Sequence, residues 1–231
     1  MASALHGALI GFEAGLERMS VPAADAAARF IRVGRTGMAA RQGGSLQLRV
    51  DRGDKVVVIE VTQDDSRVDG GSIRSRTTLE ASVDRFCSLR SWVSDTVAVD
   101  ARGRELHDTR LVEQAKVRSR DIRWTGADVG APQRTERPLT TDHTWMHAVE
   151  QLARTDDNGV LHVDLIEQLA VMRLGVRVQP SGRAQVDGQS LRVWRLRGPG
   201  LLPRHAFVGE AGHLMAWVTP TVGWFRSGRS A

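Results

Sequence analysis

The stretch from Val186 to Arg226 most constrains how this chain can fold. Short runs of β-forming residues alternate there with Asp-Gly, Gly-Pro-Gly, Gly-Glu-Ala-Gly and Thr-Pro turn signals, in the sequence VDGQSLRVWRLRGPGLLPRHAFVGEAGHLMAWVTPTVGWFR. This pattern predicts a small antiparallel meander. Three of the six tryptophans lie in it, at Trp194, Trp217 and Trp224. Rings of that size bury much apolar area only under a curved sheet or a helix, so the meander is expected to wrap around other elements.

A β-hairpin is predicted upstream of the meander. Leu46, Leu48 and Val50 alternate with polar residues, a turn follows at 51–54, and KVVVIEVT returns at 55–62. Further strands are expected around 73–83, 91–99 and 116–124.

Two helices are predicted between these strands and the meander. Thr140-Thr141-Asp142 supplies N-cap chemistry for a helix over 142–154, whose apolar stripe is Trp145, Ala148, Val149 and Leu152. A second short helix is expected from Asp164, and both helices are placed to fill an open sheet.

The expected fold class is mainly β (α+β). The pattern predicts a curved antiparallel sheet or half-barrel of about 9–11 strands, with one or two helices packed in its concave side. Residues 1–22 are expected to form an N-terminal helix or arm, and residues 23–228 a single β-rich half-barrel domain.

Composition argues against several functional classes. The 231 residues carry 32 basic and 27 acidic side chains, a formal charge of +5, but the charges are interspersed, so a nucleic-acid partner is not indicated. Cys87 is alone, which excludes an intrachain disulfide and favours the cytoplasm. The N-terminus lacks the pattern of a signal peptide, and no run approaches the ~20 apolar residues of a membrane span.

Asp95 and Glu60 are the candidate catalytic residues. Each interrupts an otherwise apolar strand face, Asp95 beside Val93 and Val97, Glu60 beside Val58. Desolvation would raise the pKa of a carboxyl there and tune it for proton exchange, unless an arginine pairs with it. The alternative is a structural ion pair with one of the many arginines.

The candidate ligand-binding residues are large aromatics and a pair of cations. In a row with Lys116, two arginines would seat an anionic head group if the row faces inward, and would be the solvated face of a sheet otherwise. The full set is Trp92, Trp145, Trp194, Phe207, Trp217, Arg118 and Arg120.

No metal or other cofactor is expected. His143, His147 and Glu150 share one face of the predicted helix, opposite its apolar stripe, so this face is interpreted as solvated rather than as a metal site. Cys87 has no histidine near it in the sequence and is interpreted as a small buried hydrophobe.

The segment GPGLLPRHAFVGEAGHLMAW at 198–217 resembles the C-terminal signature of an uncharacterised bacterial family. That signature joins a Gly-x-Gly-Leu-Leu-Pro turn, an aromatic strand, an acidic-Gly turn and a Leu-rich final strand. The chain departs from it at Gly209-Glu210 and at His213. The resemblance covers mainly the last third of the chain and implies a half-barrel like that of the lipoprotein carriers (LolA/LolB-like). It implies no catalytic residue.

Two functional hypotheses stay open. In the first, the protein binds a hydrophobic small molecule in its concavity, an acidic one among the candidates, and acts on it without a cofactor as a cyclase or isomerase of secondary metabolism. In the second, it is a non-catalytic lipid or ligand carrier, or a protein-interaction domain. Nothing in the sequence specifies the ligand or the oligomeric state.

Overall fold

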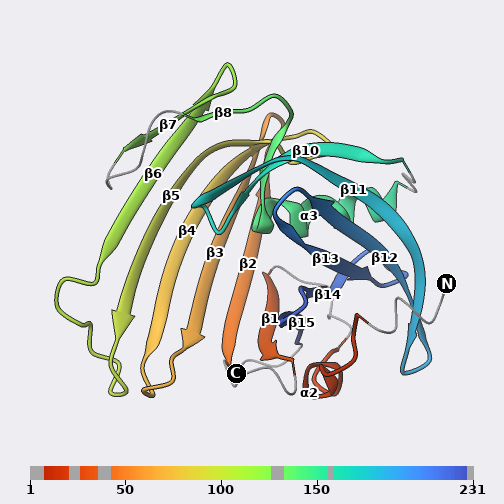
Figure 1. The fold of residues 1–231 in the computed structure, drawn as a ribbon, viewed down its shortest axis with the longest axis horizontal. Coiled ribbons are helices and arrows are strands. Elements are labelled where there is room, and N and C mark those ends of the chain that lie inside the picture. Colours follow the sequence, from red (N-terminus) through yellow and green to blue (C-terminus); the bar gives the residue numbers. More distant parts are fainter. Residues whose placement is uncertain (1–7, 21–26, 36–42, 126–132, 156–158, 228–231) are drawn as a thin grey trace.

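The fold is one large, strongly curved antiparallel sheet with a helix inside it (Figure 1). The computed structural model describes residues 8–20, 27–35, 43–125, 133–155 and 159–227. Within these ranges the elements are α2 (Glu13–Leu16), β1 (Ala27–Gly34), β2 (Gly44–Arg52), β3 (Val56–Ser66), β4 (Ser72–Ser82), β5 (Leu89–Val99), β6 (Leu111–Arg118), β7 (Asp121–Thr125), β8 (Gln133–Arg134), β9 (Leu139–Thr141), α3 (Asp142–Arg154), β10 (Leu161–Glu167), β11 (Val171–Val186), β12 (Gln189–Gly198), β13 (Leu201–Val208), β14 (Leu214–Val218) and β15 (Val222–Arg226).

The sheet consists of two antiparallel meanders joined by the first strand. Its order is β8-β7-β6-β5-β4-β3-β2-β1-β15-β14-β13-β12-β11-β10-β9, and β9 is the one strand in it that pairs in parallel. Strand β1 lies between the two meanders, because Phe30 is paired with Leu46 on one side and with Arg226 on the other. The predicted mainly β class is confirmed, with fifteen strands in the described sheet rather than the expected number.

The two edges of the sheet are close neighbours in the sequence. Strand β8 forms one edge and β9 the other, and only residues 135–138 separate them. At no more than 3.6 Å per residue, the five steps from 134 to 139 span at most about 18 Å. The sheet must therefore curl until its edges almost meet, which makes it barrel-like.

Asp164 holds the seam of the sheet, by which we mean residues 135–138 between the two edge strands. Its side chain is fully buried, and its Oδ2 accepts hydrogen bonds from the backbone N–H groups of Glu136 (2.8 Å) and Arg137 (3.0 Å) in the linker. Its Oδ1 accepts a third from the N–H of Gly175 on β11 (2.8 Å), where the φ of +65° suits a residue without a Cβ. One carboxylate on β10 thus holds the linker between the two edges and is held in turn by β11.

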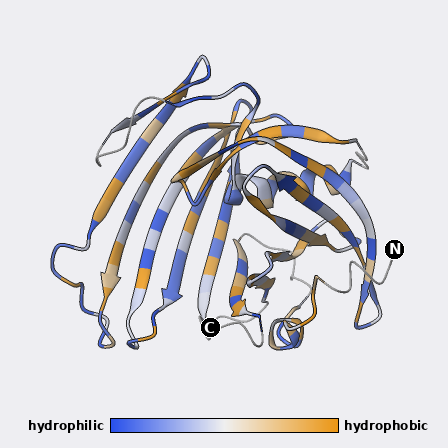
Figure 2. Ribbon diagram, in the orientation of Figure 1, coloured by the Kyte–Doolittle hydropathy of each residue, from blue (hydrophilic) through white to orange (hydrophobic). Residues whose placement is uncertain are grey.

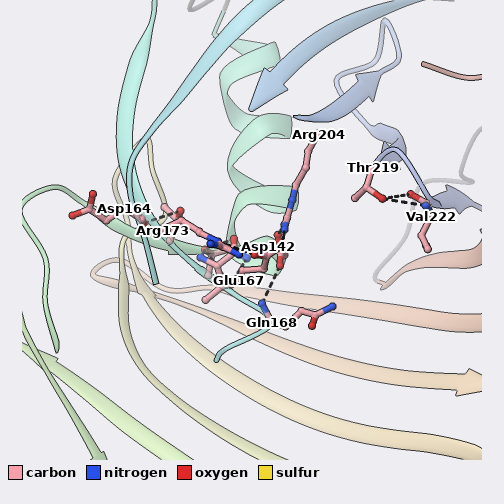
Figure 3. A network of polar contacts seen from close by, with 11 residues as sticks. Asp142, Asp164, Glu167, Gln168, Arg173, Arg204, Thr219 and Val222 are labelled. Carbon is pink, nitrogen blue, oxygen red and sulfur yellow. Dashed lines mark hydrogen bonds and ion pairs between the residues drawn. The ribbon is translucent and has the colours of Figure 1, made fainter. Parts of the chain in front are cut away.

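Helix α3 lies inside the curve of the sheet, across the direction of β2–β4 (Figures 1 and 3). Thr141 caps it in a capping box with Thr144, as the Thr-Thr-Asp sequence predicted. The predicted stripe of Trp145, Ala148, Val149 and Leu152 is buried in the main core.

The second predicted helix is wrong. Residues 161–167 form strand β10, and Asp164 lies at a bulge in it instead of capping a helix. Leu165 and Ile166 are consecutive residues, and both are buried in the main core. The sequence of β10 therefore lacks the alternation of apolar and polar residues that marks a strand with one solvated face.

The N-terminal segment packs on the convex side of the sheet. Leu9 and Phe12 are buried in a second apolar core with Phe207 and Phe225, away from the helix in the concavity. Gly15 makes this approach feasible, because a Cβ there would lie 2.4 Å from the Phe225 ring. The described part of the predicted arm, residues 8–20, is therefore a docked segment; residues 1–7 and 21–22 lie outside the described residues.

Replacing Asp164 with Asn should open the seam. An amide nitrogen would take the place of a carboxylate oxygen that now accepts a backbone hydrogen bond, so at least one buried N–H would lose its acceptor. We expect a loss of about 2–4 kcal/mol in the free energy of unfolding, measured by urea denaturation.

Asp187→Asn is the matched control. Asp187 is exposed in a hairpin turn at φ +47°, a conformation that Asn tolerates well, so the change should be within about 0.5 kcal/mol. Equal losses in the two variants would contradict the role of Asp164 as a clamp.

Candidate functional site

The concave face of the sheet changes from apolar to polar along its strands. Because alternate residues point to the same face, the rows across β2–β6 can be followed by strand register. One row is wholly apolar and buried, namely Ile59, Leu79, Trp92 and Ala115. The next two rows carry the polar side chains Thr77, Ser94, Glu113, Gln63, Ser75 and Thr96. Figure 2 shows hydrophilic segments alternating with hydrophobic ones along these strands.

A single helix cannot cover all of this face. Strands β3, β4 and β5 each have eleven residues, a length of about 36 Å, whereas a helix with its side chains is about 10–12 Å across. Helix α3 runs across the strands (Figures 1 and 3), and its apolar side chains share one core with the apolar row, whereas the polar rows line a cavity.

A partly open cavity of about 650 Å³ occupies the uncovered part of the concave side. The polar rows of β3–β6 form one wall. Trp217 and Trp224, which are cross-strand neighbours on β14 and β15, belong to another. The first turn of α3 and the tip of the β10–β11 hairpin complete the lining.

A buried ionic network borders the cavity (Figure 3). The guanidinium of Arg204 pairs with Asp142 in the first turn of α3 and with Glu167 at the end of β10. Arg173 pairs with the second carboxylate oxygen of Glu167 at 3.0 Å. The Arg204 side chain is only 6% exposed, and this desolvation lowers its pKa to about 10, so it stays protonated at neutral pH.

The β10–β11 hairpin tip is held in an uncommon backbone conformation. Gln168 and Leu169 have φ values of +51° and +57°, which cost little for Gly but more for a branched side chain. Two contacts compensate for this cost: the backbone N–H of Gln168 donates to Asp142 Oδ2 (3.2 Å), and the Leu169 side chain is buried in the core. The network thus fixes the loop that lines the cavity.

His143 lines the cavity from the first turn of α3. It is half-buried, and desolvation lowers its pKa to about 4, so the imidazole is neutral at pH 7. Thr77 and Ser94 belong to the same lining, and their hydroxyls share a hydrogen bond of 2.9 Å. The cavity therefore offers neutral hydrogen-bonding groups as well as charged ones.

The structure places both candidate catalytic acids on the convex face. Asp95 is held by two hydrogen bonds from Arg110 (3.0 and 2.6 Å), which lower its pKa, and its neighbour Val93 is 47% exposed. Glu60 is 58% exposed and lies 3.8 Å from Arg49. The inward face of β5 is the one that carries Trp92 and Ser94, so the two acids have the arginine partners of the ion-pair alternative and do not line the concavity.

Of the predicted ligand-binding residues, Trp217 lines the cavity. The side chains of Trp92, Trp145 and Trp194 are packed into the main core, and Phe207 is in the convex-side core. Arg118 and Arg120 are exposed; β6 ends at Arg118, and Arg120 belongs to the β6–β7 turn, so no cationic ladder faces inward. The solvated alternative for this row is the one that the structure has.

The polar stripe of α3 is enclosed rather than solvated. His143 faces the cavity, His147 lines a separate pocket of about 190 Å³ with Cys87, and Glu150 accepts hydrogen bonds from the Leu214 N–H and from Arg226. Cys87 is buried, and desolvation raises its pKa to about 12. Among the described residues, no group of three or more His, Cys, Asp or Glu side chains is placed to hold a metal ion.

Sequence reasoning missed most of the residues that line the cavity. The available signal was in β4, where Ser75 and Thr77 occupy the same face as the buried Leu79 and Ala81. Hydroxyls at such positions indicate either a paired polar contact or an uncovered part of the concave face. Arg204 offered no comparable signal, since its two carboxylate partners are 37 or more residues away in the sequence.

Comparisons with known proteins support the fold and nothing finer. No family model matches the chain, and no curated protein matches it in sequence. A solved structure from Brucella abortus, described as a β-barrel-like protein of domain of unknown function DUF1849, has a TM-score of 0.57 at 9% identity, covering 89% of this chain and 97% of its own. A DUF1089 family protein from Pseudomonas aeruginosa has a TM-score of 0.41 at 12% identity, covering 74% of this chain and 87% of its own.

The chain therefore has a β-barrel-like fold, which agrees broadly with the half-barrel predicted from the sequence. The family resemblance drawn from residues 198–217 has only this loose support. In the described residues, none of the helices has the length and apolar character needed to cross a bilayer.

His143→Gln should make the protein less sensitive to acid. The folded pKa of about 4 lies below the ordinary value of 6.5, so protonation favours the unfolded state, and stability falls as the pH drops from about 6.5 towards 4. At pH 4.5 this coupling corresponds to about 2.5 kcal/mol. Urea unfolding at pH 7 and at pH 4.5 should show that the variant loses about that much less stability than the wild type.

His162→Gln is the control, because His162 is exposed on β10. It should lose as much stability between pH 7 and pH 4.5 as the wild type does. A wild-type pH response in His143→Gln would mean that the imidazole is not desolvated in the cavity.

Proposed function

We propose that the protein binds an amphipathic small molecule in the cavity on the concave side of its sheet and carries or sequesters it. The observation that supports this most is the composition of the cavity walls. A hydroxyl-bearing wall on β4 and β5 lies in the same cavity as the Trp217–Trp224 pair. A ligand with one polar and one apolar part would satisfy both walls.

The size of the cavity supports the same proposal. Small-molecule sites usually have volumes of about 300–1,000 Å³, and the cavity of about 650 Å³ lies in this range. The ligand expected here is less hydrophobic than the sequence implied, because α3 already covers the apolar rows of the sheet and leaves the polar ones for the ligand.

Binding without catalysis is the better-supported variant of the proposal. The two acids expected to exchange a proton point away from the cavity, and the neutral His143, with a pKa of about 4, is a weak base at pH 7. Of the four carboxylates in the described lining, Asp142 and Glu167 are paired with Arg204 and Asp65 with Arg32, so Glu113 is left as a single acid without a second group placed to exchange a proton with it. A cyclase or isomerase activity would need a group with a pKa nearer to neutrality.

Octyl glucoside, a neutral amphiphile with a polyhydroxyl head, is a suitable probe below its critical micelle concentration. We expect isothermal titration calorimetry to detect saturable binding at a single site. Ser75→Phe should weaken this binding by about tenfold or more, because the ring would occupy the cavity beside the hydroxyl wall.

Thr78→Phe is the matched control, since Thr78 is on the same strand but exposed on the convex face. Its affinity should stay within about twofold of the wild type. If both variants bind the probe as the wild type does, the probe is not in the cavity and the proposed function loses its support. Circular dichroism and thermal melting would confirm that each variant is folded.

A further inference from the structure

The charged groups that line the cavity do not balance. Two arginines, Arg32 and Arg204, face it together with four carboxylates. Arg32 lies 3.4 Å from Asp65, which also accepts a hydrogen bond from Gln63, and Arg204 neutralises Asp142. Arg173, just outside the lining, neutralises Glu167. The fourth carboxylate is Glu113 on β6.

Glu113 has no partner for its charge. It is half-buried, and its carboxylate makes no ion pair or hydrogen bond with any residue that the structure describes. The basic residues on the same strand, Lys116 and Arg118, are exposed on the opposite face. His143 is neutral at pH 7 and adds no compensating charge. The cavity therefore holds one uncompensated negative charge, on the wall that also bears the hydroxyls.

We infer that the cavity selects a ligand with a cationic head, a primary ammonium group on an apolar body, and that Glu113 is its counter-ion. This inference rests on the proposed function and names its ligand class. It replaces the acidic ligand that the sequence allowed, because an anionic head would meet an unpaired carboxylate and no free arginine.

The neighbours of Glu113 suit an ammonium head. Ser94 is its cross-strand partner, and Thr77 is the cross-strand partner of Ser94. Side chains in such pairs start about 4.5–5.5 Å apart, so one ammonium group can donate to the carboxylate and to the hydroxyls together. The apolar body of the ligand would then extend towards Trp217 and towards Trp224, whose ring already has the guanidinium of Arg32 5.8 Å from its centroid, so the ammonium head belongs at Glu113 and the alkyl chain at the tryptophans.

The net charge of the whole protein would favour an anionic ligand over a cationic one. The formal charge of +5 would draw anionic amphiphiles to the surface in general. A preference for a cation can therefore be attributed to the local field of the cavity rather than to non-specific attraction.

Octylammonium, octanol and octanoate share one tail and differ in the charge of the head. Calorimetric titration of the full chain at pH 7, below micelle-forming concentrations, should give a dissociation constant at least tenfold lower for octylammonium than for octanoate, with octanol between them. Glu113→Gln should remove most of this preference, and thermal melting would show that the variant is folded. Glu80→Gln, the same charge change on the exposed convex face of β4, should keep the preference.

The outcomes separate the inference from the function on which it rests. Binding of octanol and octyl glucoside without any preference for octylammonium would overturn the inference and leave the proposed function intact. A preference that survives in Glu113→Gln would overturn the assignment of the counter-ion. If none of these amphiphiles binds, the proposed function fails and the inference fails with it.

Discussion

The short connection between the two edge strands sets the shape of the sheet, and the buried carboxylate of Asp164 holds that connection in place. Asp164 receives backbone hydrogen bonds from the linker between the two sheet edges and from β11, so the edges are fixed a few residues apart. A sheet of this many strands would otherwise be free to twist into an open surface. Because the sheet curls until its edges approach each other, it encloses an interior. Helix α3 (Figure 1) and the cavity both lie in that interior. The buried carboxyl group is tolerated there because each of its oxygens accepts hydrogen bonds and the guanidinium of Arg137 lies 3.6 Å from Oδ1.

The interior is filled unevenly because strands and helix differ in their dimensions. A helix lying across long strands can bury only the rows beneath it, and the side chains of Trp145 and its neighbours complete an apolar core with those rows. The sheet continues past the helix, and its side chains change there from Leu79 and Trp92 to Thr77 and Ser94. The boundary between core and cavity thus falls within a two-residue step along β4 and along β5, and the ionic network around Arg204 lies on the helix side of that boundary.

The sequence predicted the elements whose signals are local. The hairpin of β2 and β3, the capped helix α3 and the C-terminal meander all follow from turn residues and periodicity. It misassigned β10, where Leu165 and Ile166 are buried side by side and the alternation is lost. It also assigned the faces of β5 incorrectly, since Val93 and Val97 look like core residues, and only the register with β4 shows that Trp92 points inward. The cavity could not be predicted, because the partners of Arg204 and the isolation of Glu113 are consequences of the closed sheet.

The pairing of β1 with β15 has a consequence for how the chain reaches this structure. Apart from the parallel pair β9–β10, each meander is made of hairpins between neighbours in the sequence and can form from local contacts, but Phe30 meets Arg226 only across most of the chain. Joining the meanders therefore carries the largest loop-closure cost in the sheet. During synthesis β1 meets its partner β2 early, but its other partner, β15, is made much later. Until then the second edge of β1 is unpaired, which makes completion of the sheet a late step of folding.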